Sequence, residues 1–461
     1  LRMSRGLGDV YKRQGRIRSH NYNLDYIFSS ALTWTVIGTE KTSFRFCPVG
    51  FLYSNSGYGL FCNNEKTKYY LLGFMNSIIA ASLLKILSPS MGFESGYLRK
   101  LPLIESDSLD SIVERVKHCI DGSNAEWDSF EISWDFKKHP LLRNVSTISE
   151  AFTQWQSECD DRFNQLKANE EELNRIFIDI YGLQDELTPE VEEKDVTVRK
   201  ADLQRDIKSL LSYAVGCMFG RYSLDVEGLA YAGGEWDSSK YQSYIPDADN
   251  VIPITDEEYL DDDIVSRLCA WLKVVYGADT LEANLDYIAK ALGNKGSTSR
   301  EIIRNYFLND FFKDHCQTYS VTGSGKRPIY WLFDSGKQNG FKALVYLHRY
   351  TPDTIGNLRI DYLHKMQRVY ESEINRMQDM MDHSENAREV AAASKRKDKL
   401  AKQLKECREY DEKISHLALS RIELDLDDGV KVNYRKLQTA QDGKFYEVLA
   451  DSKNIMVKEK K

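Results

Sequence analysis

The sequence predicts an α+β protein in which a small β-rich module is followed by a largely helical region. Residues 29–62 alternate β-forming residues with four glycines that supply turns, which is typical of a short β-meander. Residues 148–181 carry apolar residues mostly three or four positions apart, or at multiples of these, as on one face of a helix. The stretch from Asn357 to Asp428 contains no Gly or Pro, which favours long helices.

Composition excludes several classes of protein. A length of 461 residues is compatible with about three domains. Apolar residues make up 42% and charged residues 29%, which excludes collagen-like, mucin-like and low-complexity chains. The most apolar run, 69–91, is interrupted by polar residues and lacks the roughly 18 uninterrupted apolar residues of a membrane span. The eight cysteines form no CxxC pair, so we predict neither a zinc site nor a disulfide framework and expect a reducing cytoplasm.

The net charge of −8 is unevenly distributed along the chain. Residues 15–104 carry nine Lys or Arg against four Asp or Glu, whereas residues 105–461 sum to −16. A basic segment on an acidic chain suggests one region that meets a polyanion. A chance fluctuation of charge would give the same numbers, so the charge distribution alone does not establish a polyanion-binding region.

The first fourteen residues, LRMSRGLGDVYKRQ, look like translated adapter sequence from a metagenomic assembly. They lack the apolar stretch of a signal peptide. We exclude residues 1–14 from fold reasoning and expect the natural protein to extend beyond this N-terminus.

Local patterns predict the remaining elements. Residues 69–87 are expected to form one largely buried helix and residues 198–220 another. Two apolar-aromatic runs, 328–333 and 341–347, are joined by DSGKQNG, whose Asn-Gly pair suits the positive φ angles of a tight turn.

Two further predictions concern the last hundred residues. The polar stretch within 357–428 marks either the tip of an antiparallel helical hairpin or a break in one long coiled helix. Residues 430–448 look like a small closing β element. The expected organisation is an artefact at 1–14, a β-rich module at 15–104, a linker at 105–145, a helical domain at 146–350 with a β-hairpin at 328–347, a long helical hairpin at 351–420, and a small β element and tail at 421–461.

No segment makes a convincing active site. The GxG in SNSGYGLF and the VTGSGK segment are both interpreted as turns, because each lacks essential parts of a phosphate-binding loop. PDAD at 246–249 is interpreted as an acidic loop, since no well-spaced ExK follows it. The eight histidines show neither HExxH nor triad spacing, and no metal site is predicted.

The run from Leu32 to Leu103 resembles the target-recognition region of restriction-modification adenine DNA methyltransferases. The resemblance rests on the pattern LTWTxIGxxKxSFRFxPxGF, on YYLLGFMNSIIAASLLKILSP, and on a Gly-containing loop that closes on LRKLPL. In such modules the LLGxxNS helix packs behind the strands. The resemblance therefore implies that residues 15–104 are a DNA-binding module.

The downstream sequence is similar to the C-terminal region of PglX-type methyltransferases of BREX phage-defence systems. The similarity covers residues 29 to about 450 and rests on the shared order of several motifs. These are ISWDFKKHPLL (132–142), ELNRIFIDIYGLQDELTPEV (172–191), IKSLLSYAVGCMFGRYSLD (207–225), RPIYWLFDSGKQNGFKALVYLHRY (327–350) and LDDGVKVNY (426–434).

That family transfers a methyl group from S-adenosylmethionine to the amino group of a flipped adenine in double-stranded DNA, using an Asn-Pro-Pro-Tyr loop. None of the nine prolines of this chain are adjacent, so it cannot contain that loop, and the Gly-rich cofactor loop is also missing. The resemblance implies an enzyme whose catalytic half lies upstream. We expect this chain to be its DNA-reading and partner-docking half, inactive alone and without bound cofactor, with other phage-defence proteins as partners.

The residues expected to read DNA combine Lys or Arg for phosphates with Asn for base edges. The cluster CNNEKTK (62–68) concentrates both types in one loop between a strand and a helix. A solvated loop is the alternative. The candidates are Lys41, Arg45, Asn55, Asn63, Asn64, Lys66 and Lys68, followed by Arg99 and Lys100.

Secondary candidates for DNA or partner contact lie on and after the β-hairpin turn: Lys337, Gln338, Asn339, Lys342, His348 and Arg349. The basic run 395–408 is interpreted as a solvated helix face. Aromatic residues of 44–61 are expected in the core, with Phe44 and Phe46 on one strand face and Arg45 on the other.

Two other functions remain open on the sequence alone. The main alternative is a non-enzymatic specificity or scaffold subunit whose helices dock a separate catalytic subunit. A structural coiled-coil protein fits residues 357–420 but leaves the β-rich module unexplained.

Overall fold

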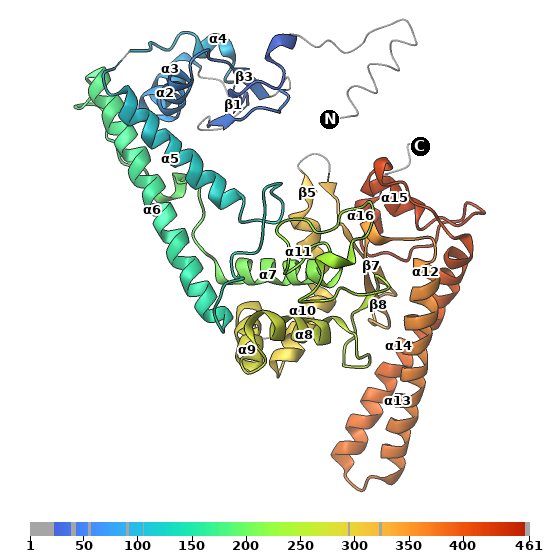
Figure 1. Cartoon of the computed structure of the whole chain (residues 1–461). Helices are drawn as coiled ribbons and strands as arrows, with labels where there is room; N and C mark the ends of the chain where they lie inside the picture. Colours follow the sequence, from blue (N-terminus) through green and yellow to red (C-terminus); the bar gives the residue numbers. More distant parts are fainter. Residues whose placement is uncertain are drawn as a thin grey trace, which may run out of the picture. The chain divides into compact units, whose positions relative to one another are not determined.

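The structure, a computed structural model, has the α+β class that the sequence predicts, with many helices and small antiparallel sheets (Figure 1). It divides into two compact units, of which unit 1 comprises residues 1–126 and 158–200 and unit 2 comprises residues 127–157 and 201–461. The residues that it describes are 23–37, 43–53, 57–88, 92–104, 106–293, 296–321 and 325–456.

Unit 1 begins with a three-stranded antiparallel sheet of β1 (Ala31–Thr35), β2 (Phe44–Cys47) and β3 (Gly57–Leu60). The strand order is β2-β1-β3, so the predicted meander, in which each strand pairs with the next, is wrong. The most buried strand, β1, takes the central position, and a central strand pairs its backbone on both edges.

The helix expected over residues 69–87 is two helices, α2 (Glu65–Asn76) and α3 (Ile78–Leu87), which meet at an angle of 67°. Ser77 between them has an extended backbone, and its hydroxyl accepts a hydrogen bond from the amide of Ala80 as the cap of α3. In the described residues no single helix is long and apolar enough to cross a membrane, although this bent pair passes that test of length and composition.

The core of unit 1 joins the sheet and α2 to two long helices, α5 (Leu109–Trp127) and the part of α6 (Ile148–Tyr181) from residue 158 onward. Residues 105–145, expected to be a linker, thus contain a helix whose Ile112 and Val116 are buried one turn apart. The predicted helix at 148–181 is confirmed by α6. A short helix, α4 (Ser95–Leu98), also contributes to this core.

Unit 2 surrounds a second antiparallel sheet, in which β8 (Lys342–Tyr346) lies between β4 (Ile252–Pro253) and β7 (Tyr330–Asp334). The predicted hairpin is therefore confirmed as the β7–β8 pair. Asn339 in its turn has φ of 54°, as expected of the Asn-Gly pair. The other elements here are α7 (Leu203–Met218), α8 (Ile264–Tyr276), α9 (Leu281–Leu292), α10 (Ser299–Asn309), α11 (Phe311–Thr318), β5 (Ser320–Val321) and β6 (Gly325–Lys326).

A helical hairpin follows, in which α13 (His364–His383) and α14 (Ala387–Ser420) lie side by side (Figure 1). Of the two arrangements that the sequence left open, the structure forms two antiparallel helices and not one long helix. The chain enters the hairpin through α12 (Thr354–Asn357) and one π-helical segment, η5 (Leu358–Leu363).

The C-terminal segment corrects the expectation of a closing β element. Residues 430–436 form α15 (Val430–Lys436), and α16 (Ser452–Ile455) follows. The fully buried Gln438 replaces a strand partner, because its side-chain oxygen accepts hydrogen bonds from the amides of Val448 and Leu449 at 2.9 and 3.0 Å. Only isolated bridges of β type, such as Phe333 with Leu449, remain in the described part of this segment.

Candidate nucleic-acid interface

The sheet of unit 1 has one core face and one outward face, as the alternation of β2 predicts. Leu32 and Trp34 of β1 point into the core, together with Phe44 of β2. Thr33 stands opposite both Arg45 and Gly59, so these three residues share the other face. Arg45 is exposed there, in the position that the sequence predicts.

Aromatic rings lie over the glycine end of this outward face. A Cβ atom added to Gly59 would lie 2.8 Å from the ring of Phe61 and 3.3 Å from that of Tyr53. The ring centroids of Tyr53 and Tyr26 lie 5.3 and 4.7 Å from that of Phe61. We call Arg45, Tyr26, Tyr53 and Phe61 the sheet surface. It combines a cation with partly exposed aromatic rings, two features that nucleic-acid-binding surfaces use.

The aromatic part of the sheet surface is not foreseen from the sequence, which predicts core positions for the aromatic residues of 44–61, Tyr53 and Phe61 among them. The available signal is the alternation of Gly57 and Gly59 along β3. Gly59 has no side chain on this face, and the space above it is filled by the rings of Phe61 and Tyr53 from outside the strand.

Most of the cluster at 62–68 belongs to the start of α2 and not to a loop. Its residues have different roles. Asn63 is exposed. Asn64 is the N-cap, and its Oδ1 accepts hydrogen bonds from the amides of Lys66 and Thr67 at 2.8 and 3.4 Å. Lys66 is exposed and pairs with Asp110 at 2.7 Å, an exposed pair that competes only weakly with a ligand.

Lys68, expected to hold a phosphate, is turned inward. Its side chain is only 5% exposed, and its Nζ donates to the hydroxyl of Ser30 at 2.7 Å. The ammonium also lies 5.9 Å from the ring centroid of Phe46. In this conformation Lys68 joins the helix to the sheet and is not accessible to a phosphate.

Arg99 and Lys100 are exposed directly after α4. The Lys100 ammonium lies 5.8 Å from the ring centroid of Tyr97. Lys41 and Asn55 lie outside the described residues. Arg45, Asn63, Asn64, Lys66, Arg99 and Lys100 are therefore the predicted primary candidates that the structure exposes, and of these Asn64 is already engaged as the N-cap of α2.

The secondary candidates also include both exposed and buried side chains. Lys337 and Gln338 are exposed on the β7–β8 turn, and Asn339 is half-buried. Lys342 is buried and donates to the carbonyl of Leu308 at 2.9 Å. His348 is partly buried, and burial lowers its pKa to about 4.

Arg349 has a structural role. Its guanidinium donates to the carbonyls of Phe219 at 3.2 Å and Asp247 at 2.8 Å, and lies 4.4 Å from the ring centroid of Trp236. It therefore holds the PDAD loop in place. Burial raises the pKa of Asp247 in that loop to about 7, although Arg267 contacts its carboxylate.

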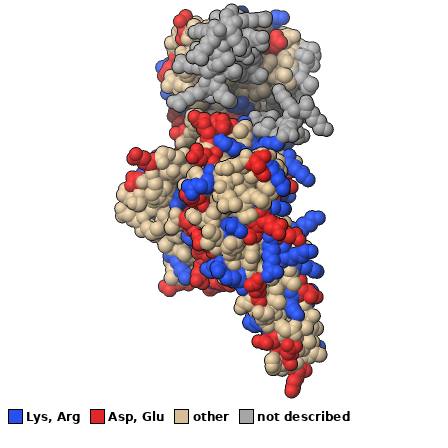
Figure 2. Space-filling model, turned by 90° about the vertical axis from the view of Figure 1, so that its right-hand side faces the viewer, with Lys and Arg blue, Asp and Glu red and all other residues tan. Residues whose placement is uncertain are grey.

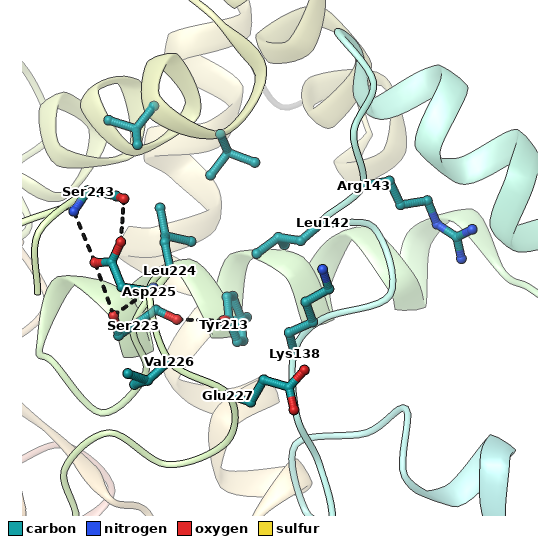
Figure 3. Close-up of a pocket in the computed structure, with 12 residues that line it drawn as sticks. Lys138, Leu142, Arg143, Tyr213, Ser223, Leu224, Asp225, Val226, Glu227 and Ser243 are labelled. Atoms are coloured by element: carbon teal, nitrogen blue, oxygen red, sulfur yellow. Dashed lines mark hydrogen bonds between the residues drawn. The ribbon is translucent and has the colours of Figure 1, made fainter. Parts of the chain in front are cut away.

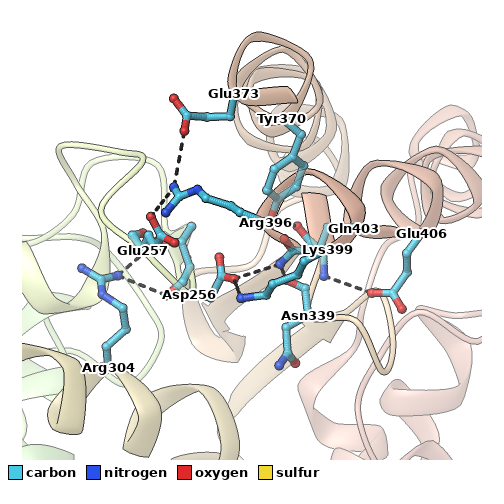
Figure 4. A network of polar contacts seen from close by, with 12 residues as sticks. Asp256, Glu257, Arg304, Asn339, Tyr370, Glu373, Arg396, Lys399, Gln403 and Glu406 are labelled. Carbon is cyan, nitrogen blue, oxygen red and sulfur yellow. Dashed lines mark hydrogen bonds and ion pairs between the residues drawn. The ribbon is translucent and has the colours of Figure 1, made fainter. Parts of the chain in front are cut away.

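Acidic side chains neutralise much of the basic run of α14. Arg396 pairs with Glu257 at 2.6 Å and Lys399 with Asp256 at 2.5 Å, as Figure 4 shows. Arg408 pairs with Glu371 of α13 at 2.6 Å. On the face of unit 2 in Figure 2, basic and acidic side chains are correspondingly interspersed.

A pocket of about 370 Å³ opens on unit 2 (Figure 3). Asp225 at its wall accepts hydrogen bonds from the amides of Gln242 and Ser243 at 2.7 and 3.0 Å and from the Ser243 hydroxyl, which lowers its pKa. This carboxylate joins two loops and is fully engaged. The other lining residues include Lys138, Leu142, Tyr213, Val226, Glu227 and Val274.

None of these features forms a metal-binding site or an activated nucleophile. Within the described ranges, no group of three or more His, Cys, Asp or Glu side chains is placed to hold a metal ion. The cysteines are free thiols, and burial raises the pKa of several of them, including Cys119 and Cys217, to about 12.

Two curated proteins are similar to this chain over nearly its whole length. It is 48% identical over 439 residues to the adenine-specific methyltransferase PglX of Lacticaseibacillus casei (strain Zhang) and 35% identical over 479 aligned positions to the adenine-specific methyltransferase BrxX of Escherichia coli O9:H4 (strain HS). The chain is homologous to both methyltransferases. The alignments cover 93% and 96% of this chain but 36% and 38% of the relatives, so the chain spans little more than a third of their length. No protein-family model matches it.

Homology to PglX and BrxX raises the question of an S-adenosylmethionine site. Such a site is expected after a strand of a parallel sheet, where a Gly-rich loop leads into a helix. Every strand pair in the described parts of the chain is antiparallel. The described residues therefore do not fit the cofactor, and we derive no methyl-transfer step from them.

Proposed function

We propose that this chain supplies the DNA-recognition part of a site-specific adenine DNA methyltransferase of the PglX/BrxX kind. In this proposal the complete enzyme uses S-adenosylmethionine, acts in phage defence, and docks other proteins of the defence system through unit 2. The observation that carries the proposal is the sheet surface, which joins an exposed Arg to partly exposed rings in a homologue of two adenine-specific methyltransferases.

Each part of this surface has a chemistry suited to DNA. Arg45 presents a guanidinium that bonds either a phosphate or the paired acceptors of guanine. Asn63 presents an amide that matches the donor and acceptor of adenine, while Lys66 suits phosphates. The rings of Tyr53 and Phe61 lie beside these groups in the sequence and offer apolar contact to sugar or thymine methyl groups.

A direct test is binding of the 461-residue chain to duplex DNA, followed by fluorescence anisotropy at several salt concentrations. We expect weak, strongly salt-dependent binding, because residues 15–104 carry a net charge of only +5 on an otherwise acidic chain. Arg45→Ala should weaken binding several-fold. Lys85→Ala is the matched control, since it removes one exposed charge of unit 1 from α3. Equal effects of the two substitutions would contradict a specific role of the sheet surface.

A second test asks whether the chain selects the sequence. The 439-residue homologous region of the L. casei relative is replaced by the corresponding part of this chain, and methylated adenines are mapped genome-wide. If the chain reads DNA, the methylated motif should change with the exchanged region. Asn63→Ala in the chimera should relax the motif, whereas Lys66→Ala should lower methylation without changing it. An active chimera that keeps the L. casei motif would overturn the proposal.

A further inference from the structure

One carboxylate of α14 accepts most of the hydrogen bonds that hold the turn between β7 and β8 against this helix. Glu406 accepts hydrogen bonds from the Ser335 hydroxyl at 2.7 Å and from the amides of Gln338 and Gly340 at 2.8 and 3.0 Å. Tyr370 of α13 donates to the carbonyl of Gly340 at 2.8 Å. The turn is therefore fixed to both helices of the hairpin.

Two glycines allow this close approach. A Cβ atom on Gly340 would lie 2.7 Å from the carbonyl oxygen of Gln403, and one on Gly336 would lie 2.9 Å from Glu406 Oε2. Gly336 also has φ of 140°, which other residues rarely adopt. As a result the turn backbone is packed against α14, while the side chains of Lys337 and Gln338 are exposed.

Three lysines of α14 lie on the same helix face as Glu406. Lys395, Lys399 and Lys402 precede Glu406 at intervals of four, three and four residues, which returns to one face on every turn of a helix. All three side chains are exposed. Figure 4 shows Lys399, Gln403 and Glu406 along this helix, with Asn339 of the turn beside them.

This face keeps positive charge, whereas Arg396, Lys405 and Arg408 of the same basic run are paired with acidic side chains. Lys399 pairs with Asp256, but Lys337, Lys395 and Lys402 form no ion pair with any described residue. We call Lys337, Gln338, Lys395, Lys399 and Lys402 the turn–helix surface.

We propose that the turn–helix surface is a second, sequence-independent contact to double-stranded DNA, a proposal that rests on the proposed function. From Lys395 to Lys402 the helix advances about 10 Å, a length over which B-DNA carries about six phosphates. Lysines act as point charges that satisfy phosphates without selecting a base. In this proposal unit 1 recognises the DNA sequence, and this surface of unit 2 increases the affinity for DNA without any sequence preference.

The test uses the full 461-residue chain and random-sequence duplex DNA. The triple variant Lys337→Ala, Lys395→Ala, Lys402→Ala is compared with Lys313→Ala, Lys413→Ala, Lys436→Ala, which removes the same charge from exposed positions of unit 2. The first triple variant should lower the slope of log affinity against log salt by about 2–3, because each lost phosphate contact contributes about 0.9. The control should change the slope by less than about 1.

The outcomes separate this inference from the proposed function. Equal effects of the two triple variants, together with weaker binding of Arg45→Ala, would overturn the second contact and leave the sheet surface in place. Absence of DNA binding by the unmodified chain would overturn both. Equally strong binding of polyglutamate at matched charge would also overturn the DNA contact, because it would point to an acidic protein partner.

Discussion

Acidification should destabilise unit 2 through histidines that are buried without charge. His315 is 3% exposed, and its Nε2 accepts hydrogen bonds from the amides of Ile329 and Tyr330 at 3.0 and 3.1 Å. A proton on Nε2 would remove both bonds. Burial, assisted by the nearby Arg221, lowers the pKa of His315 to about 3.

The magnitude follows from the difference in proton binding between the two states. The unfolded chain gains a proton on this imidazole as the pH falls below about 6.5, whereas the folded chain does so only near pH 3. Stability is therefore lost as the pH falls between these values, by about 1.9 kcal/mol per histidine from pH 7 to pH 5. His139, whose pKa burial also lowers to about 3, should contribute a similar amount.

The assay is urea unfolding at pH 7, 6 and 5, followed by the fluorescence of Trp271 and Trp331, which are buried in unit 2. In His315→Gln the amide oxygen is able to accept the same hydrogen bonds but does not titrate. We expect the difference in unfolding free energy between wild type and variant to shrink by about 2 kcal/mol from pH 7 to pH 5. His383→Gln is the control, because this exposed side chain is in water in both states. A constant difference for His315→Gln would refute the assignment of a neutral, buried imidazole.

Three substitutions test contacts that hold separate elements together, each by urea unfolding. Asn76→Ala should cost about 1–3 kcal/mol, since this amide bonds both backbone groups of Phe44 at 2.9 and 3.0 Å and so joins α2 to β2. Gly340→Ala should cost a similar amount, because the new methyl group would meet the Gln403 carbonyl. Gln438→Ala should cost about 2–4 kcal/mol, because it leaves two buried amides of the C-terminal segment without an acceptor. Unchanged stability in any of these variants would show that the contact is replaced by water or by local rearrangement.

The elements that the sequence predicts best are those whose pattern is long or symmetric. The helix α6 begins and ends at the predicted residues 148 and 181, because its apolar stripe continues over many turns. The β7–β8 hairpin follows from two matched apolar runs around one Asn-Gly pair. In these elements local preference and tertiary packing agree.

Two of the errors occur where a side chain replaces a backbone partner. Ser77 ends α2 and caps α3 within a run that reads as one continuous apolar helix. Gln438 satisfies the amides that would otherwise call for a neighbouring strand. A capping Ser and a buried Gln have no periodic signature, so the pattern of apolar residues cannot reveal them.

In the candidate interface, too, the sequence pattern predicts some charged side chains at the surface correctly and others wrongly. The sequence predicts the outward strand face for Arg45, and the structure has it there, since alternation along β2 fixes that side. For Lys68 the sequence predicts a position at the surface, but its ammonium bonds Ser30, a residue 38 positions earlier that sequence spacing does not bring near. Its partner is visible only in the folded chain.

The charge of a segment is therefore a poor guide to the charge of a surface. Residues 395–408 carry seven cations against two acids in the sequence, yet acids from α13 and from the loop at 256–257 pair with several of those cations. The acidic loop and the basic helix are thus two halves of one structural contact, which anchors α14 to unit 2. The lysines that remain for a polyanion include Lys395 and Lys402, which lie on the same helix face as Glu406, the acid within the basic run that fixes the β7–β8 turn to α14.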